Sequence, residues 1–334
     1  MDRVKLHQGA GGRGMQSLLD EVIRPFLANP LLDQGHDGAY LDGPGAGLVM
    51  TTDSFVVSPL FFPGGDIGKL ALCGTVNDLA MCGAVPLWLS LAMIIEEGFP
   101  LDQLKQIMES FSFEAKQAGV QVVTGDTKVV EQGKGDGLYL NTTGIGRQLV
   151  EKAFSPKNLA QGDVILINGG IAEHGLAILA AREELPFESP PQSDCASLHD
   201  LTQAMIQACP SIRLLRDPTR GGLASCGNEL AEAAGLSICF DEEAIPITDQ
   251  TSAALNMLGI DPLQVANEGK LLAFCPALEA ANLLAAMRSH PLGQDAAIIG
   301  QVEEKSTAPL WLKTKVGTRR MVDMPLGEQL PRIC

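Results

Sequence analysis

The chain has 334 residues, about twice the length of an average domain, and this length predicts two domains that each bury their own core. Aspartate and glutamate number 40 against 24 lysines and arginines, so the net charge of −16 disfavours binding to nucleic acid phosphates or anionic lipid head groups. An apolar fraction of 46% with 19% charged residues is typical of a folded globular protein and excludes a disordered one.

Apolar periodicity predicts alternating strands and helices in the first half of the chain. The expected strands are residues 48–57, 87–95, 120–123 and 138–145, and the expected helices are 67–81 and 101–118. The sequence turns polar between Arg147 and Gly162, which predicts a domain boundary. The second half repeats the pattern, with strands near 163–167, 236–240, 271–274 and 296–302 and helices near 174–182, 197–208, 222–234 and 278–289.

This pattern predicts an α+β protein with an N-terminal domain over residues 1–152 and a C-terminal α+β domain over 153–316. The periodicity ends near Val316, so we expect residues 317–334 to form a flexible tail. Its terminal residue, Cys334, has no core to fill, and a thiolate is a strong nucleophile. We interpret it as an attachment point on a swinging arm that could reach on the order of 45 Å. An incidental terminal cysteine is the alternative.

The longest apolar stretch, Leu87 to Ile95, is too short to cross a bilayer, and the first residues lack the apolar core of a secretory signal. We therefore expect a cytoplasmic protein without a membrane-spanning segment. The eight cysteines form no CxxC pair and no cluster with histidine at zinc spacing. Most of them should be small buried side chains in a reducing compartment.

Four aspartates lie at predicted strand ends or beside glycines: Asp37, Asp53, Asp78 and Asp126. Carboxylates from separate elements, with no histidine or cysteine beside them, suit Mg²⁺ that bridges phosphates. This pattern indicates a nucleotide site. For any single aspartate, an ordinary helix cap or turn is the alternative.

Three glycine-rich stretches, 9–12, 64–68 and 216–222, could bring backbone N–H groups close to phosphate oxygens. The last adds Arg216 and Arg220 before a predicted helix, where N–H donors and the helix dipole favour an anion. None has Walker A or Rossmann spacing, and ordinary turns are the alternative. Glu268 and Lys128 are candidates for proton transfer and for neutralising a phosphoryl group.

Several segments together resemble the HypE family of hydrogenase maturation factors. They are residues 51–57, 61–70, 74–80, 125–130 and 216–222 and the terminal Pro331-Arg332-Ile333-Cys334. The resemblance covers essentially the whole chain. Its terminal motif is the most specific part, because aminoimidazole ribonucleotide synthetase, selenophosphate synthetase and thiamine-monophosphate kinase share the architecture but lack that tail.

The resemblance implies an ATP-dependent carbamoyl dehydratase that makes the cyanide ligands of nickel–iron hydrogenase. In that family the carbamoyltransferase HypF loads the terminal cysteine, here Cys334, and ATP-driven dehydration turns the carbamoyl group into a thiocyanate. The nitrile then passes to iron held by the HypC–HypD complex. Glu268 would remove the nitrogen proton, and Lys128 would stabilise charge. An ATP-dependent synthetase or kinase acting on a free small molecule, and a passive carrier or scaffold, are the alternatives.

The implied fold is a two-domain ATP-binding synthetase-like architecture with ATP in the cleft, in which N-terminal strands form a barrel across a homodimer. ATP and Mg²⁺ are the implied cofactors. The metal ligands would be Asp37, Asp53, Asp78 and Asp126, with Asp42 as an alternative to Asp37. The nucleotide would be bound by Gly64, Gly65, Lys69, Thr75, Asn77, Arg216, Asp217, Arg220, Gly221 and Gly222.

Overall fold

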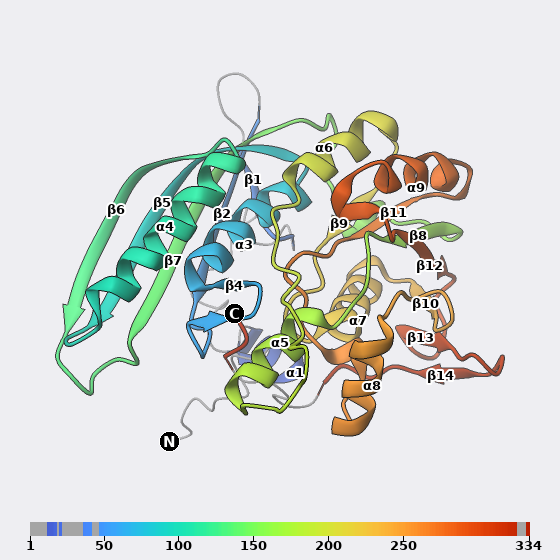
Figure 1. The fold of residues 1–334 in the computed structure, drawn as a ribbon. Coiled ribbons are helices and arrows are strands. Elements are labelled where there is room, and N and C mark those ends of the chain that lie inside the picture. Colours follow the sequence, from blue (N-terminus) through green and yellow to red (C-terminus); the bar gives the residue numbers. More distant parts are fainter. Residues whose placement is uncertain (1–11, 19, 22–35, 42–46, 326–331) are drawn as a thin grey trace.

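The computed structural model describes residues 12–18, 20–21, 36–41, 47–325 and 332–334. Two sheets with helices packed against them make up the molecule, one from each half of the chain (Figure 1). A short helix, α1 (Gly12–Leu18), precedes them. In the part of the chain that the structure describes, no helix is long and apolar enough to cross a membrane.

The N-terminal sheet has five strands in the order β1-β2-β7-β5-β6, antiparallel except for the parallel pair β5 and β6. The strands are β1 (Ala39–Leu41), β2 (Leu48–Phe55), β5 (Ala84–Glu96), β6 (Gln121–Val130) and β7 (Leu138–Gln148). Helices α3 (Ile67–Met81) and α4 (Leu101–Gln117) pack together beside this sheet (Figure 1). A small hairpin, β3 (Phe61–Phe62) and β4 (Gly65–Asp66), leads into α3.

Helix α3 is buried on nearly all sides because it lies between the sheet and the C-terminal half (Figure 1). It begins at Asp66, whose carboxylate accepts hydrogen bonds from the backbone N–H groups of Gly68 and Lys69. Its small residues permit close packing. A Cβ on Gly74, for example, would lie 2.9 Å from the ring of Phe55 on β2.

The C-terminal sheet has seven strands in the order β14-β13-β10-β12-β8-β11-β9. They are β8 (Asp163–Ile167), β9 (Leu214–Arg216), β10 (Ser237–Asp241), β11 (Leu272–Pro276), β12 (Ala297–Glu303), β13 (Leu310–Lys313) and β14 (Arg319–Met321). The helices of this half are α5 (Glu173–Arg182), α6 (His199–Ala208), α7 (Gly222–Ala234), α8 (Asp249–Leu258) and α9 (Ala280–Arg288).

The α+β class and most of the expected elements agree with the structure. Strand β6, expected only over 120–123, runs to Val130. The prediction was too short because nearly all of the strand is solvent-exposed, so its sequence carries no one-sided apolar pattern. The expectation of a wholly flexible tail is wrong for two parts of it. Strand β14 pairs with β13, and Arg332–Cys334 lie packed in the protein interior. The division at residues 152 and 153 stays a prediction.

The two halves share an interface through α3. The apolar cluster around α3 includes Ile178, Cys195 and Ala266 from the C-terminal half. It also includes the last two residues, Ile333 and Cys334. All eight cysteines are free and buried, as expected for small core side chains. The chain end therefore returns to the junction between the two halves, next to the first residues after β2.

Candidate active site

Three predicted site aspartates meet at the junction of the two halves. Asp37 precedes β1, Asp78 lies on α3, and Asp217 follows β9; one carboxylate oxygen from each lies within 4.8 Å of the others. The Thr51 hydroxyl on β2 lies 2.7 Å from Asp78 Oδ2. Arg216 forms an ion pair with Asp37. We call Asp37, Asp78 and Asp217 the acidic cluster.

The acidic cluster concentrates negative charge in a buried place. Burial, and then the charges of Asp217 and Asp53, raise the pKa of Asp78 well above its usual value. Burial likewise raises the pKa of Asp217 and of Asp53, with nearby arginines opposing the shift. Within the described part of the chain, Asp37 Oδ2 is buried and has no hydrogen-bond partner. Three clustered carboxylates, only one of which forms an ion pair with an arginine, are oxygen donors that suit a hard divalent cation.

The acidic cluster contains two of the four predicted metal ligands, Asp37 and Asp78, while Asp53 and Asp126 lie outside it. Asp217, expected to contact phosphate, belongs to the acidic cluster, and Asp53 on β2 acts electrostatically on it. Asp126 lies instead on the edge strand β6, where its exposed carboxylate pairs with Lys128 at 2.7 Å. The alternative ligand Asp42 lies outside the described residues.

The strand register shows why Asp126 lies far from the acidic cluster of its own chain. Asp126 pairs with Ala92 on β5, Ala92 with Asn141 on β7, and Asn141 with Ser54 on β2. Three strand spacings of about 4.8 Å therefore separate Asp126 from the β2 position next to Asp53, which is roughly 14 Å. Lys128, two residues further along β6, is also exposed and far from the cluster.

The terminal cysteine lies at this same junction. Cys334 is 8% exposed, and its main-chain oxygen accepts a hydrogen bond from the Val56 N–H at 3.1 Å. Burial raises the pKa of the Cys334 thiol, with the Arg220 guanidinium opposing the shift and Glu268 and Asp53 adding to it. The pKa of Arg220 is raised by its electrostatic interactions with Cys334, Asp53, Glu268 and Asp78. The predicted thiol, base and arginine are therefore brought together beside the acidic cluster.

Glu268 is buried, and its Oε1 has no hydrogen-bond partner among the described residues. Burial is the main cause of a pKa raised well above that of an ordinary glutamate, and Cys195 and Asp217 add to it. The Glu268 carbonyl accepts from the Asn77 side chain at 3.1 Å. A buried carboxyl group with a raised pKa, close enough to the Cys334 thiol to interact with it electrostatically, is typical of a general acid or base.

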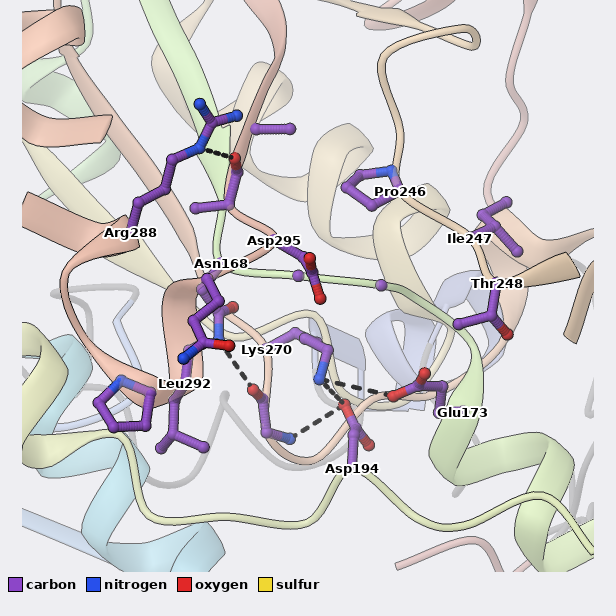
Figure 2. Close-up of a pocket in the computed structure, with 17 residues that line it drawn as sticks. Asn168, Glu173, Asp194, Pro246, Ile247, Thr248, Lys270, Arg288, Leu292 and Asp295 are labelled. Carbon is purple, nitrogen blue, oxygen red and sulfur yellow. Dashed lines mark hydrogen bonds and ion pairs between the residues drawn. The ribbon is translucent and has the colours of Figure 1, made fainter. Parts of the chain in front are cut away.

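The backbone of the Glu268 loop is fixed from behind by Asp194. Its two carboxylate oxygens accept from the N–H groups of Glu268 at 3.1 Å and Gly269 at 3.3 Å. Lys270 pairs with Asp194 at 3.2 Å and with Glu173 at 3.7 Å, as Figure 2 shows. Glu173, Asp194 and Lys270 line a pocket of about 670 Å³ in the C-terminal half. The sequence carries no signal for Asp194, because its role arises only from a contact 74 residues away.

The glycine-rich 216–222 stretch folds tightly at the start of α7. Gly221 and Gly222 have φ values of 74° and 57°, a region that favours glycine. A Cβ on Gly222 would lie 2.5 Å from the Val265 carbonyl oxygen. Arg220 interacts electrostatically with Asp53 and Asp78, while Arg216 forms an ion pair with Asp37. This stretch therefore supplies both arginines and Asp217 to the junction.

The remaining predicted nucleotide residues mostly stabilise the fold. Lys69 bonds the Gly64 carbonyl at 3.1 Å, and a Cβ on Gly64 would lie 2.8 Å from the backbone of Ser193. The buried Thr75 hydroxyl pairs with that of Thr142. Asn77 joins the two halves, since its amide also contacts Ala196 O and Leu198 N. Gly65 lies in the hairpin before α3.

Comparison with known proteins agrees with this geometry. Residues 35–148 match the N-terminal domain model of AIR synthase related proteins, and residues 160–311 match the C-terminal domain model. The carbamoyl dehydratase HypE of Cupriavidus necator is 52% identical over 333 residues, 99% of this chain and 95% of that protein. The chain belongs to the HypE family.

Solved HypE structures extend the comparison to the whole fold. A HypE in complex with ATP is 42% identical, with a TM-score of 0.83, and covers 99% of this chain and 100% of that chain. A chain of the HypE–HypF complex is 46% identical, with a TM-score of 0.88, and covers 92% of this chain and 100% of that one. The HypE family predicted from the motifs is thus confirmed along the full chain.

Proposed function

We propose that this chain is an ATP-dependent carbamoyl dehydratase that converts a carbamoyl group on Cys334 into a thiocyanate, supplying cyanide ligands for nickel–iron hydrogenase. The observation that carries the proposal is the buried position of Cys334 in the apolar cluster around α3, where its thiol interacts electrostatically with Arg220, Glu268 and the cluster aspartate Asp217. A synthetase acting on a free small molecule would not need its own chain end in that place. The relatives named carbamoyl dehydratase support the same conclusion.

The chemistry removes one water from the group R–S–CO–NH₂. The carbamoyl oxygen attacks the γ-phosphorus of ATP, ADP leaves, and the nitrogen gives up one proton. Inorganic phosphate then departs with that oxygen while the second nitrogen proton is removed, which leaves R–S–C≡N. Glu268 would accept a proton, because a buried carboxylate with a raised pKa is a stronger base than an exposed one. Arg220 would stabilise the charge on the transferred phosphoryl group.

The acidic cluster, with Asp53, would hold Mg²⁺. The fit rests on the oxygen-only donor set and on the buried Asp37 Oδ2, which has no hydrogen-bond partner among the described residues. When bound, Mg²⁺ would neutralise the triphosphate of ATP. A solved HypE binds ATP, and we propose the same nucleotide for this chain.

HypF is the proposed source of the carbamoyl group, since a HypE forms a complex with HypF. Because Cys334 is buried in the described state, the tail has to leave the site before HypF can load it. Transfer of the nitrile to iron carried by HypC–HypD, and a cytoplasmic location, complete the proposal.

A homodimer is proposed through β6. Large apolar side chains on β6 and its neighbours are exposed, among them Val123 at 60%, Val129 at 68% and Ile94 at 46%. An open edge strand of this length invites pairing with a second copy. Such pairing is consistent with a barrel across the dimer, and we propose that Asp126 and Lys128 reach the reacting group across that interface.

Mass spectrometry of the intact protein tests the activity. After incubation with HypF, carbamoyl phosphate and Mg-ATP, Cys334 should gain a carbamoyl group that loses one water only when ATP is present. Glu268→Gln should load but not dehydrate, and Cys334→Ala should remain unmodified. ATP turnover that is indifferent to Cys334→Ala would favour a small-molecule synthetase, and loading without any ATP consumption would favour a passive carrier.

Light scattering tests the dimer. Val123→Lys should convert a dimer into a monomer, because it places a charge in the proposed strand pairing. Val316→Lys is the matched control, since Val316 is 85% exposed in the C-terminal half, away from β6. A dimer that survives Val123→Lys, or one that Val316→Lys disrupts to the same extent, would contradict the interface.

A further inference from the structure

The last three residues are held mainly through their backbone. The Arg332 carbonyl accepts from Ser58 N–H at 3.2 Å and from Arg182 Nη2 at 3.0 Å. The Ile333 carbonyl accepts from His174 Nε2 at 2.8 Å, and the Cys334 main-chain oxygen accepts from Val56 N–H. The backbone carbonyls of the segment therefore all have donors from distant parts of the chain, two of them backbone N–H groups and two of them side chains.

One side chain of the tail adds sequence selectivity. Arg332 Nε donates to the Val56 carbonyl at 2.8 Å, and its guanidinium pairs with Asp136 and lies 5.9 Å from the centre of the Tyr139 ring. Ile333 is 4% exposed and packs in the apolar cluster around α3. We call the residues that contact the tail, Val56, Ser58, Asp136, Tyr139, His174 and Arg182, the tail groove.

The tail groove keeps its donors in place through contacts that do not involve the tail. Arg182 Nε and Nη2 bond the Ser58 carbonyl at 2.9 and 2.6 Å. His174 is fully buried, so its pKa is lowered and the ring is neutral. Its Nδ1 lies 2.8 Å from the Ser193 hydroxyl, which holds the ring in place, and its Nε2 carries the proton because the Ile333 carbonyl can only accept. Preorganisation of this kind lowers the cost of binding.

We propose that the tail groove is a peptide-binding site that recognises a C-terminal Arg-Ile-Cys segment whether or not the segment is part of the same chain. A separate peptide with this ending would then bind in trans, and an S-carbamoyl peptide would be dehydrated there. Trans turnover rests on the proposed function, but trans binding does not. Because a tethered segment has an effective concentration of order mM, we expect a Kd for the free peptide below about 1 mM.

The binding experiment uses the full-length chain carrying Arg332→Ala and Cys334→Ala, which weakens its own tail and removes its thiol. Fluorescence anisotropy would follow a labelled peptide that copies residues 329–334. We expect saturable binding, and a loss of affinity of about tenfold when the peptide arginine is changed to alanine or when Arg182→Ala is added to the protein. Circular dichroism and thermal unfolding would confirm that each variant is folded.

The outcomes separate the two proposals. Absence of saturable peptide binding to the folded protein at millimolar concentration overturns the tail groove as a separate site, as does equal binding of the alanine peptide. In a second experiment, the S-carbamoyl peptide and Mg-ATP are added to the protein, and mass spectrometry measures whether the peptide loses one water. Binding without dehydration, while the wild-type chain dehydrates its own tail, overturns trans turnover. Binding while the wild-type chain fails to dehydrate contradicts the proposed function and leaves the peptide site standing.

Discussion

Replacement of Asp78 by asparagine should stabilise the metal-free protein. The acidic cluster places three carboxylates within 4.8 Å of one another, and two ionised groups at that distance repel by about 3.5 kcal/mol at an effective dielectric constant of about 20. Arg216 and partial protonation relieve part of this repulsion. We therefore expect Asp78→Asn to raise the free energy of unfolding by about 1–3 kcal/mol near pH 8. Asparagine retains an oxygen for the Thr51 hydroxyl.

The effect should depend on pH in a defined direction. The pKa of Asp78 is higher in the folded protein than in the unfolded chain. Its contribution to stability is therefore fully present below the unfolded pKa, near 3.9, and is lost as the pH rises through the folded pKa. Wild type and variant should be equally stable near pH 4 and should diverge toward pH 8.

Urea unfolding followed by circular dichroism, in EDTA and then in Mg²⁺, measures both effects. Mg²⁺ should raise the unfolding midpoint of the wild type and raise that of Asp78→Asn much less, because a ligand that binds only the folded state stabilises it. Asp323→Asn, with a side chain 71% exposed, is the control and should change neither response. A variant that is less stable than wild type at pH 8 without metal, or that responds equally to Mg²⁺, would refute the reasoning.

Two further predictions concern the backbone around the site. Asp194→Asn should lower the dehydration rate about tenfold and cost about 1–3 kcal/mol of stability, because the Asp194 carboxylate holds two N–H groups of the Glu268 loop and the Lys270 ammonium. Unchanged single-turnover rates would contradict this. Gly222→Ala should destabilise the protein by more than about 1 kcal/mol, since a Cβ there meets the Val265 carbonyl. Gly235 is the control, because its φ is also positive but a Cβ there would meet open space. Denaturant unfolding should therefore show a smaller loss of stability for Gly235→Ala than for Gly222→Ala. Equal losses of stability would argue against crowding as the cause.

Short-range patterns in the sequence predicted much of the secondary structure. Helices α3 and α4 lie within a residue of their expected ends, because apolar spacing and the Asp66 cap act locally. Helices α1 and α8 and strands β1, β3, β4, β9, β13 and β14 were not predicted. Strands β9, β13 and β14 are three or four residues long, and such segments take their structure from pairing with distant neighbours.

The sequence by itself determined the chemistry available at the site. It pointed to the terminal thiol, Glu268 and the aspartates, because residue type and motif set which groups can donate, accept or attack. Only the tertiary structure decided which of them meet. It brought Asp217 together with Asp37 and Asp78, placed Asp126 on an exposed edge strand, and gave Asp194, His174 and Arg182 their supporting contacts. These contacts join residues 74 to 159 positions apart, and no local spacing records such distances. They exist only once α3 is packed between the two halves and the chain end has returned to the residues that follow β2.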